Sequence, residues 1–321
     1  MTEAGDRHSG LRKFAALVTL YTIAVILFGA WVRVTGSGAG CGEHWPSCHG
    51  EVIPRAPNIK TIIEFTHRLT SGLDGLFILG LAIAVFRGTP SGNRARTWAV
   101  RAGVFLIIEA LIGAVLVKFG LVADDTSKIR VLVVALHLVN TLLLVGSIAM
   151  VGLALAPAPA EAADRRGLRN TLLAGLVYMV ICAMGAVTAL GDTLFPIIFG
   201  ASVEHLVPSE ASAHFLERAR LIHPVVAVVG SLWILHVGAA AAAAPAPTRS
   251  AGRLVVAGIL LQTVIGVANI WLSAPGWMQL VHLATANFVW LALVWQAACY
   301  SAPSGAAEVI PKMRAIGDEI A

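Results

Sequence analysis

The sequence predicts an all-α polytopic membrane protein with eight transmembrane helices, arranged as two tandem, repeat-related four-helix bundles. Of its 321 residues, 57% are hydrophobic and only 13% are charged, whereas soluble domains have about 45–50% apolar and about 25% charged residues. The apolar residues form long runs that lack the two-residue alternation of membrane β-strands. Short motifs also recur in the same order along both halves of the chain. This composition argues against a soluble enzyme, a disordered scaffold and a nucleic-acid-binding protein.

Eight apolar runs are long enough to cross a lipid bilayer, which requires about 20 residues of helix. Breaks rich in Gly, Pro and charged residues separate these runs. The predicted helices cover residues 13–34, 61–86, 99–121, 130–155, 171–190, 217–240, 252–273 and 277–299. The first run follows basic residues, as in a signal peptide, but it is too long and no small-residue cleavage site follows it. We therefore predict that it is retained as the first helix.

The distribution of Lys and Arg predicts the orientation, because these residues collect in cytoplasmic loops. With the N-terminus inside, the inner segments contain 14 of the 23 Lys and Arg residues. An even number of helices returns the C-terminus to the same side. We therefore expect a multi-pass protein of the plasma membrane with both termini cytoplasmic. The formal net charge of +5 then reflects orientation rather than nucleic-acid binding.

Matching motifs indicate two related halves with the same orientation. The recurring pairs are Gly29-Ala30 and Gly185-Ala186, Ile112-Gly113 and Ile265-Gly266, and His137-Leu138 and His282-Leu283. The predicted organisation is an N-terminal half over 1–155, a cytoplasmic linker over 156–170, a C-terminal half over 171–300 and a cytoplasmic tail over 301–321.

Four histidines stand near the outer ends of the second, fourth, sixth and eighth predicted helices: His67, His137, His223 and His282. Ionisable residues inside a membrane span are costly and usually functional. Two imidazoles that face each other across a four-helix bundle form a natural bis-histidine heme site. A Zn or Cu site would need additional ligands, so we predict one heme per half. The other histidines, His8, His44, His49, His205, His214 and His236, are predicted to have no ligand role.

The two halves differ in chemistry beside these histidines. Glu64 stands three residues before His67 on the same helix face, whereas Arg220 stands three residues before His223. A carboxylate beside a heme can act as a base, and an arginine suits a heme propionate. Our hypothesis is that the first half performs chemistry and the second holds a structural or electron-transfer heme. The alternative for Glu64 is a solvated carboxylate near the positive end of a helix.

Two further acidic or amide positions correspond between the halves. Glu109 in the third predicted helix matches Gln262 in the seventh. We interpret Glu109 as a partner in a hydrogen bond between helices.

The cysteines divide into one loop pair and two helix residues. Cys41 and Cys48 lie in the first outer loop, and a pair on the oxidising side of a membrane is expected to form a disulfide. This bond could staple the loop or exchange thiols in a redox cycle. Cys182 and Cys299 are interpreted as packing residues.

Together these residues resemble the heme A synthase family. The resemblance depends on the outer loop from Gly36-Ser37-Gly38 through Trp45-Pro46 to Cys48-His49-Gly50, on Glu64-Phe65-Thr66-His67-Arg68, and on the helix-start histidines. It spans residues 13–299, and the combination of motifs is specific.

The resemblance implies an eight-helix oxidoreductase that converts the C8 methyl group of heme O to the formyl group of heme A. The family reaction is written as two hydroxylations followed by loss of water. By resemblance, Glu64 is catalytic, His67 and His137 bind the substrate heme O, and His223 and His282 ligate the iron of a heme b cofactor. The implied partners are a heme O synthase and the terminal oxidases that receive heme A. Some bacterial members carry a second cysteine pair between the fifth and sixth helices, which residues 191–217 lack.

Two rival functions explain part of the pattern. A non-catalytic di-heme cytochrome b explains the four histidines equally well but gives no role to Glu64 and the cysteine loop. A heme carrier predicts exchangeable heme in one half. The identity of the bound heme separates these functions, because only the synthase makes hydroxylated or formylated heme.

Overall fold

The computed structural model describes residues 2–157, 164–196 and 214–301. The regular elements in these ranges are eight α-helices, all of them long and apolar enough to cross a membrane. They are α1 (Thr2–Val34), α2 (Ile59–Gly88), α3 (Arg94–Lys118), α4 (Lys128–Ala154), α5 (Arg165–Leu194), α7 (Phe215–Ala242), α8 (Thr248–Trp271) and α9 (Gly276–Tyr300). The predicted fold class, an all-α multi-pass membrane protein, is confirmed.

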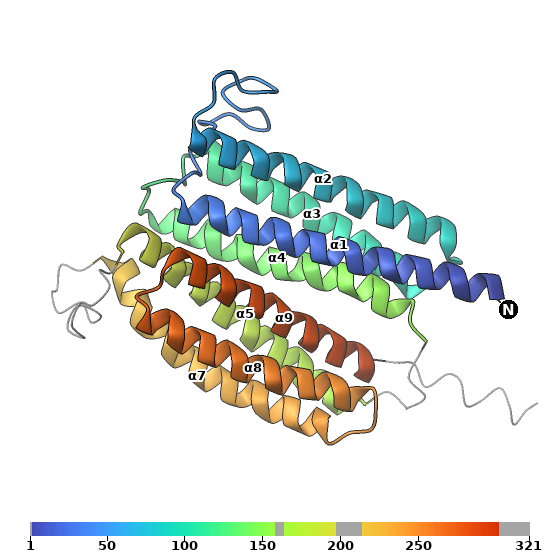
Figure 1. The fold of residues 1–321 in the computed structure, drawn as a ribbon. Coiled ribbons are helices and arrows are strands. Elements are labelled where there is room, and N and C mark those ends of the chain that lie inside the picture. The colour runs from blue at the N-terminus through green and yellow to red at the C-terminus, as the bar shows by residue number, and fades with distance from the viewer. Residues whose placement is uncertain (1, 158–163, 197–213, 302–321) are drawn as a thin grey trace, which may run out of the picture.

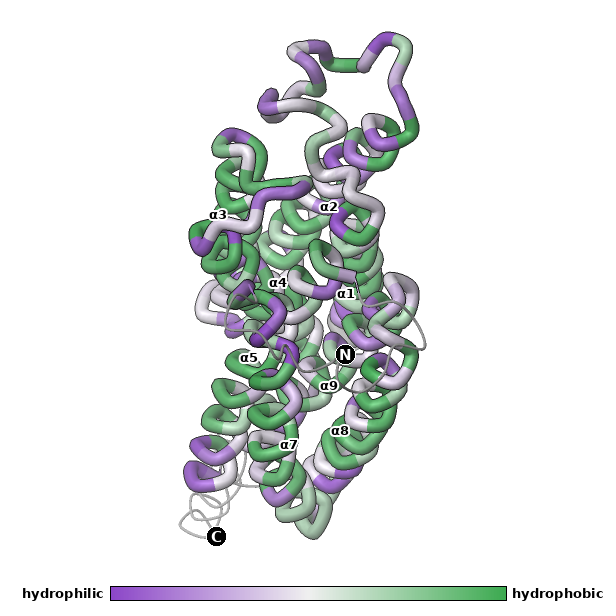
Figure 2. The backbone as a smooth tube through the Cα atoms, turned by 90° about the vertical axis from the view of Figure 1, so that its left-hand side faces the viewer, coloured by the Kyte–Doolittle hydropathy of each residue, from purple (hydrophilic) through white to green (hydrophobic). Residues whose placement is uncertain are grey.

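The helices form two groups of four that lie side by side. Figure 1 shows α1–α4 in one group and α5, α7, α8 and α9 in the other, with the α1–α2 loop projecting at the end opposite the N-terminus. Seen along the helices in Figure 2, the two groups remain separate and meet through their central members. Neighbours along the chain pack together in each group, and α1 also packs on α4 as α5 packs on α9. The origin of both groups from one repeat remains a prediction.

Each group has its own apolar core, and α4 and α9 join the two. One core contains Leu81 and Val85 of α2 with Ile148 of α4. The other is built around Trp290 of α9. The indole Nε1 of Trp290 donates to the carbonyl of Leu142 at 2.6 Å, so a directional bond crosses the seam between the groups.

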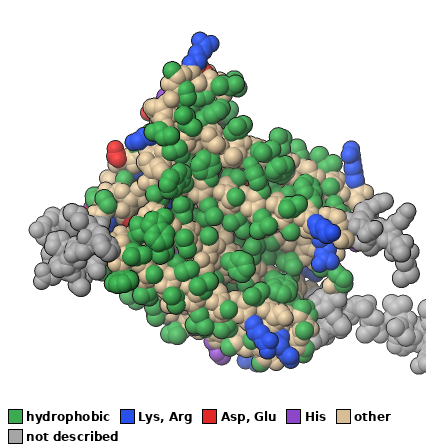
Figure 3. Space-filling view, viewed as in Figure 1, with side chains coloured by type: hydrophobic (Ala, Val, Ile, Leu, Met, Phe, Trp, Pro, Cys, Tyr) green, Lys and Arg blue, Asp and Glu red, His purple; other side chains and the backbone are tan. Residues whose placement is uncertain are grey.

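The outer surface of the helices is apolar, as expected for contact with lipid. Many exposed large side chains are Leu, Ile and Val, and hydrophobic side chains cover most of the face seen in Figure 3. A soluble protein would bury many of these side chains away from water, whereas in a bilayer they are surrounded by apolar lipid chains.

Polar side chains cap the starts of five helices, with Asp164 at α5 and His214 at α7. Asn58 caps α2, Asn93 caps α3 and Ser127 caps α4, each by accepting a backbone N–H of the first turn. Such caps satisfy donors that have no partner inside the helix.

Candidate functional site

The four predicted histidines lie on α2, α4, α7 and α9, two in each group. His67 lies close enough to His137 for the charges of their rings to interact, and His223 and His282 are related in the same way. The structure thus places one histidine pair in each group, and the role of these pairs as heme ligands stays a prediction.

Two of the histidine rings carry a buried nitrogen with no partner. In the described part of the chain, the Nδ1 atoms of His67 and His282 are buried and make no hydrogen bond. Unpaired buried polar atoms are uncommon in folded proteins and call for an explanation. These rings therefore fit a role as metal-binding groups better than a role as packing residues.

Three of the histidine rings rest directly against a glycine of the neighbouring helix. A Cβ added at Gly29 would lie 3.0 Å from Cε1 of His67, and one added at Gly185 would lie 3.1 Å from Cε1 of His223. A Cβ at Gly266 would lie 3.2 Å from Cε1 of His282. Since these spacings are too short for an ordinary side chain, the glycines of the recurring motifs make room for imidazole rings.

The fourth ring, His137, has a different neighbour. A Cβ at Gly113 would meet nothing within 4 Å, and the contact comes instead from Glu109 of α3, whose Oε1 lies 3.2 Å from His137 Nδ1. The Glu109 carboxylate is therefore a direct polar contact on the Nδ1 side of this ring.

Glu109 also accepts hydrogen bonds from α4. Asn140 Nδ2 donates to its Oε2 at 2.6 Å, and the Thr141 hydroxyl donates to its Oε1. The prediction that Glu109 forms a hydrogen bond between helices is confirmed.

In the C-terminal group, Gln262 of α8 takes the position that corresponds to Glu109. Its Nε2 lies 3.2 Å from His282 Nε2 and donates to the His282 carbonyl at 3.2 Å. The two rings therefore have different neighbours. His282 has a neutral amide at Nε2, whereas His137 has a carboxylate at Nδ1.

Glu64 is buried beneath the first outer loop, with 4% of its surface exposed. Its Oε2 accepts the backbone N–H of Cys41 at 2.8 Å, and its Oε1 accepts Nη2 of Arg68 at 2.5 Å. The alternative that Glu64 is a solvated helix-start carboxylate is therefore wrong. The physical reason is that the loop folds back over the start of α2 and excludes water.

The loop itself is closed by the predicted disulfide between Cys41 and Cys48, which is confirmed with an S–S distance of 2.06 Å. Both cysteines are buried. The loop rests on α2 through the Thr61 hydroxyl, which donates to the Gly40 carbonyl at 2.7 Å. A Cβ at Gly40 would lie 2.4 Å from the carbonyl oxygen of Lys60, so only glycine fits this approach.

Arg220 is held by the end of α5. Its Nε donates to Asp192 Oδ1 at 2.7 Å, and its Nη2 donates to the carbonyls of Gly191 and Phe195. The guanidinium proposed for a heme propionate therefore already has an acidic partner in this structure.

Two arginines near helix ends, one of them at the seam, were missed by the sequence reasoning. Arg33 of α1 donates across the seam to the Ala189 carbonyl at 2.6 Å, to the Thr193 hydroxyl and to Gln279 Oε1 at 2.9 Å. Arg130 of α4 is buried, and its Nε has no partner among the described residues. Both could have been found from the sequence, because each is an arginine close to the end of an apolar span.

Asp74 of α2 was missed as well. It is 4% exposed and accepts a hydrogen bond from the Thr22 hydroxyl of α1 at 2.9 Å. Asp74 stands seven residues, or two helical turns, after His67, so both side chains lie on one face of α2.

The cysteines and histidines that were predicted to have no ligand role lie outside the two histidine pairs. Cys182 is half-buried and Cys299 is buried in a helix, as expected for packing residues. His236 contacts Trp233, with ring centroids 5.8 Å apart, and His205 lies outside the described residues. No group of three His, Cys, Asp or Glu side chains suited to a bare metal ion occurs within 2–157, 164–196 and 214–301.

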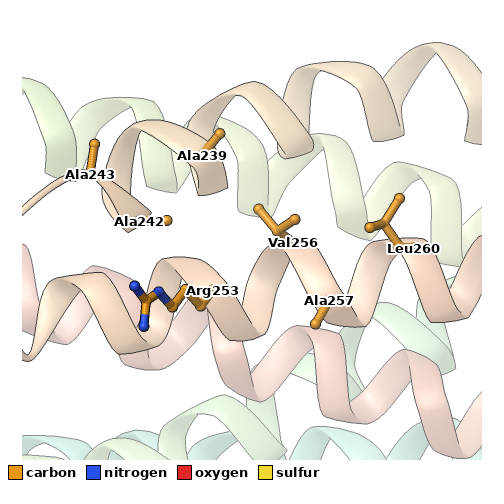
Figure 4. A pocket seen from close by; sticks show the side chains of 7 residues that line it. All are labelled: Ala239, Ala242, Ala243, Arg253, Val256, Ala257 and Leu260. Atoms are coloured by element: carbon orange, nitrogen blue, oxygen red, sulfur yellow. The ribbon is translucent and has the colours of Figure 1, made fainter.

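A groove of about 500 Å³ between α7 and α8 lies apart from the histidines. Alanines, Val256 and Leu260 form its walls, and Arg253 is its charged residue (Figure 4). None of the predicted site residues lines it.

Comparison with known proteins gives a family match over most of the chain. A family model described as cytochrome oxidase assembly protein (COX15-CtaA) matches residues 12–294. A heme A synthase of Halalkalibacterium halodurans is 32% identical over 242 residues, which are 71% of this chain and 78% of that protein.

A second kind of relative is longer. A protein named protoheme IX farnesyltransferase from Thermus thermophilus is 43% identical over 294 residues, which are 90% of this chain but 48% of that protein. The chain therefore spans about half the length of this relative.

Proposed function

Because the chain belongs to the heme A synthase family of cytochrome oxidase assembly proteins, we propose that it oxidises the C8 methyl group of heme O to the formyl group of heme A. Two successive hydroxylations and loss of water are the finer steps of this proposal. The observation that carries it is an asymmetry between the two histidine pairs: among the described residues, the first pair has a buried carboxylate, Glu64, one turn before His67, whereas Arg220 stands one turn before His223.

The N-terminal half is proposed to hold the substrate heme O between His67 and His137. The C-terminal half is proposed to hold heme b between His223 and His282. The paired rings and the glycines beside three of them support this assignment. A bound heme supplies redox chemistry, while the protein supplies its orientation and surroundings.

Glu64 is proposed as the catalytic carboxylate. The Cys41 N–H and Arg68 donate hydrogen bonds to it and fix its position. A carboxylate one turn from His67 can accept a proton released at the oxidised methyl group or stabilise positive charge on that carbon. The covering loop keeps bulk water away from this acid.

We also propose the source of the substrate, the recipient of the product and the location of the protein in the cell. A heme O synthase would supply the substrate, and terminal oxidases would receive the product. The name of the Thermus thermophilus relative supports a link to heme farnesylation. The distribution of Lys and Arg supports a plasma-membrane protein with cytoplasmic termini.

The test is to purify the full chain from cells that also produce a heme O synthase, and to identify the extracted hemes by chromatography and mass. We expect heme A or hydroxylated heme O from the native chain, and heme O without product from Glu64→Gln. The matched control is Glu51→Gln, since Glu51 is an exposed loop acid paired with Arg55. Heme b alone, with heme O abundant in the membrane, would contradict the proposal.

A further inference from the structure

The contacts of the second histidine in each half differ in charge and in the nitrogen that they occupy. In the N-terminal half, the Glu109 carboxylate lies 3.2 Å from Nδ1 of His137. In the C-terminal half, the Gln262 amide lies 3.2 Å from Nε2 of His282, and Nδ1 of His282 has no partner among the described residues. The two halves thus surround corresponding rings in chemically distinct ways.

Glu109 is held firmly in place by the helix that carries its histidine. Its partners Asn140 and Thr141 stand three and four residues after His137, so all three face α3 from one side of α4. Asn140 also donates to the Phe105 carbonyl at 2.9 Å, and Thr141 also donates to the His137 carbonyl at 2.8 Å. These bonds fix the carboxylate relative to both helices and leave one oxygen beside the imidazole.

A carboxylate beside one ring nitrogen affects the other nitrogen. It orients the ring, favours the tautomer with its proton on Nδ1, and makes Nε2 a stronger electron donor to a metal. Nε2 of His137 would then be the nitrogen free to bind a heme iron. Gln262, being neutral and placed at Nε2, cannot act on His282 in this way.

We propose that Glu109 is a positioning residue that holds His137 by its Nδ1 side and makes it a stronger iron ligand than His282. This inference rests on the proposed function, because it takes His137 and His282 as heme ligands. Its consequence is that the N-terminal heme has the lower reduction potential of the two, even when both halves contain the same porphyrin. The difference arises from ligand surroundings, one of the means by which proteins tune heme iron.

The test is a potentiometric titration of the full chain reconstituted with hemin, so that both halves hold an identical porphyrin. His67→Ala and His223→Ala variants assign each midpoint to its half. We expect Glu109→Gln, which keeps the side-chain shape but removes the charge, to shift the N-terminal midpoint to a more positive value and leave the C-terminal one in place. Glu109→Asp, which keeps the charge on a shorter side chain, should lie between Glu109→Gln and the native chain.

Gln262→Leu removes the neutral contact at Nε2 of His282 and should leave the N-terminal midpoint in place. An unchanged N-terminal midpoint in Glu109→Gln, or equal shifts of both midpoints, would overturn the proposal. If Glu109→Gln loses its N-terminal heme, Glu109→Asp decides, and an N-terminal midpoint equal to the native one then overturns it. Failure of the native chain to bind hemin through these histidines would instead contradict the ligand assignment in the proposed function.

Discussion

Glu64 and Arg68 lie one helical turn apart on α2 and form an ion pair of 2.5 Å beneath the disulfide loop. The other terminal nitrogen of the Arg68 guanidinium, Nη1, donates to the loop carbonyls of His44 at 2.6 Å and Ser47 at 2.5 Å. Glu64 in turn accepts the N–H of Cys41. The proposed catalytic acid and its neighbour therefore hold the loop from both sides, which ties the position of the acid to the fold of the loop.

Replacing Arg68 with Gln should loosen the loop and lower product formation. Removing one member of a buried ion pair costs about 3–5 kcal/mol, and we expect the lower end because the Arg68 side chain keeps 13% exposure. Denaturant unfolding and the heme A yield measure the two effects. Arg55→Gln is the control, since Arg55 pairs with Glu51 but is 90% exposed and should change stability by about 0–1 kcal/mol. Equal effects of the two variants would contradict the role given to Arg68.

Adding a methyl group at Gly29 should displace His67. Overpacking of this kind costs about 1–3 kcal/mol, equivalent to a roughly 5- to 150-fold weaker heme affinity. Gly29→Ala should therefore reduce the heme content of the N-terminal half, and Gly185→Ala that of the C-terminal half, as measured by hemochrome absorbance. Gly113→Ala is the matched control because a Cβ there meets nothing within 4 Å. The interpretation fails if Gly29→Ala retains as much heme as Gly113→Ala.

Replacing Arg33 with Met should weaken the seam between the two groups of helices. The variant loses the bonds to Ala189, Thr193 and Gln279, and hydrogen bonds to a charged group contribute about 1.5–3 kcal/mol each. A lower thermal midpoint in detergent is the expected result. Arg12→Met changes an exposed arginine of the same helix and should melt like the native chain. A native midpoint for Arg33→Met would show that these bonds contribute little.

Removing the disulfide distinguishes its two predicted roles. Closing a loop with a sequence separation of 7 stabilises a protein by about 2.5 kcal/mol in the loop-entropy estimate. If the bond only staples the loop, the Cys41→Ser/Cys48→Ser double variant should keep reduced but measurable heme A formation at low temperature. If the thiols exchange during turnover, product should be absent under all conditions. A reductant should affect the native chain and leave the double variant unchanged.

The spans and the histidine pairing were predictable from sequence because both depend on local patterns. All eight helices match the predicted runs, with ends that differ by several residues. The largest difference is at α1, which begins at Thr2 rather than at residue 13, since polar residues can continue a helix beyond the apolar run that hydropathy detects. Asn93 caps α3 six residues before the predicted start at residue 99.

The charged contacts at the seam could not be predicted in the same way. Arg33 and Gln279 are 246 residues apart, and no periodicity connects them. Arg68 was visible in the motif with Glu64, but its bonds to the loop depend on the path of the chain between Cys41 and Cys48. Glu109 was correctly interpreted as a hydrogen-bonding residue, whereas its contact with His137 requires knowing which faces of α3 and α4 meet.

If both halves bind heme as proposed, the direct packing of α4 on α9 also determines what lies between the two hemes. His137 and His282 stand on these two helices, which the Trp290 indole fastens together at the Leu142 carbonyl. Packed helix axes lie about 8–10 Å apart, so hemes bound to these histidines would be separated by side chains and backbone of the seam rather than by water or a mobile linker. A packed seam of this kind would keep the separation between the two proposed sites nearly constant.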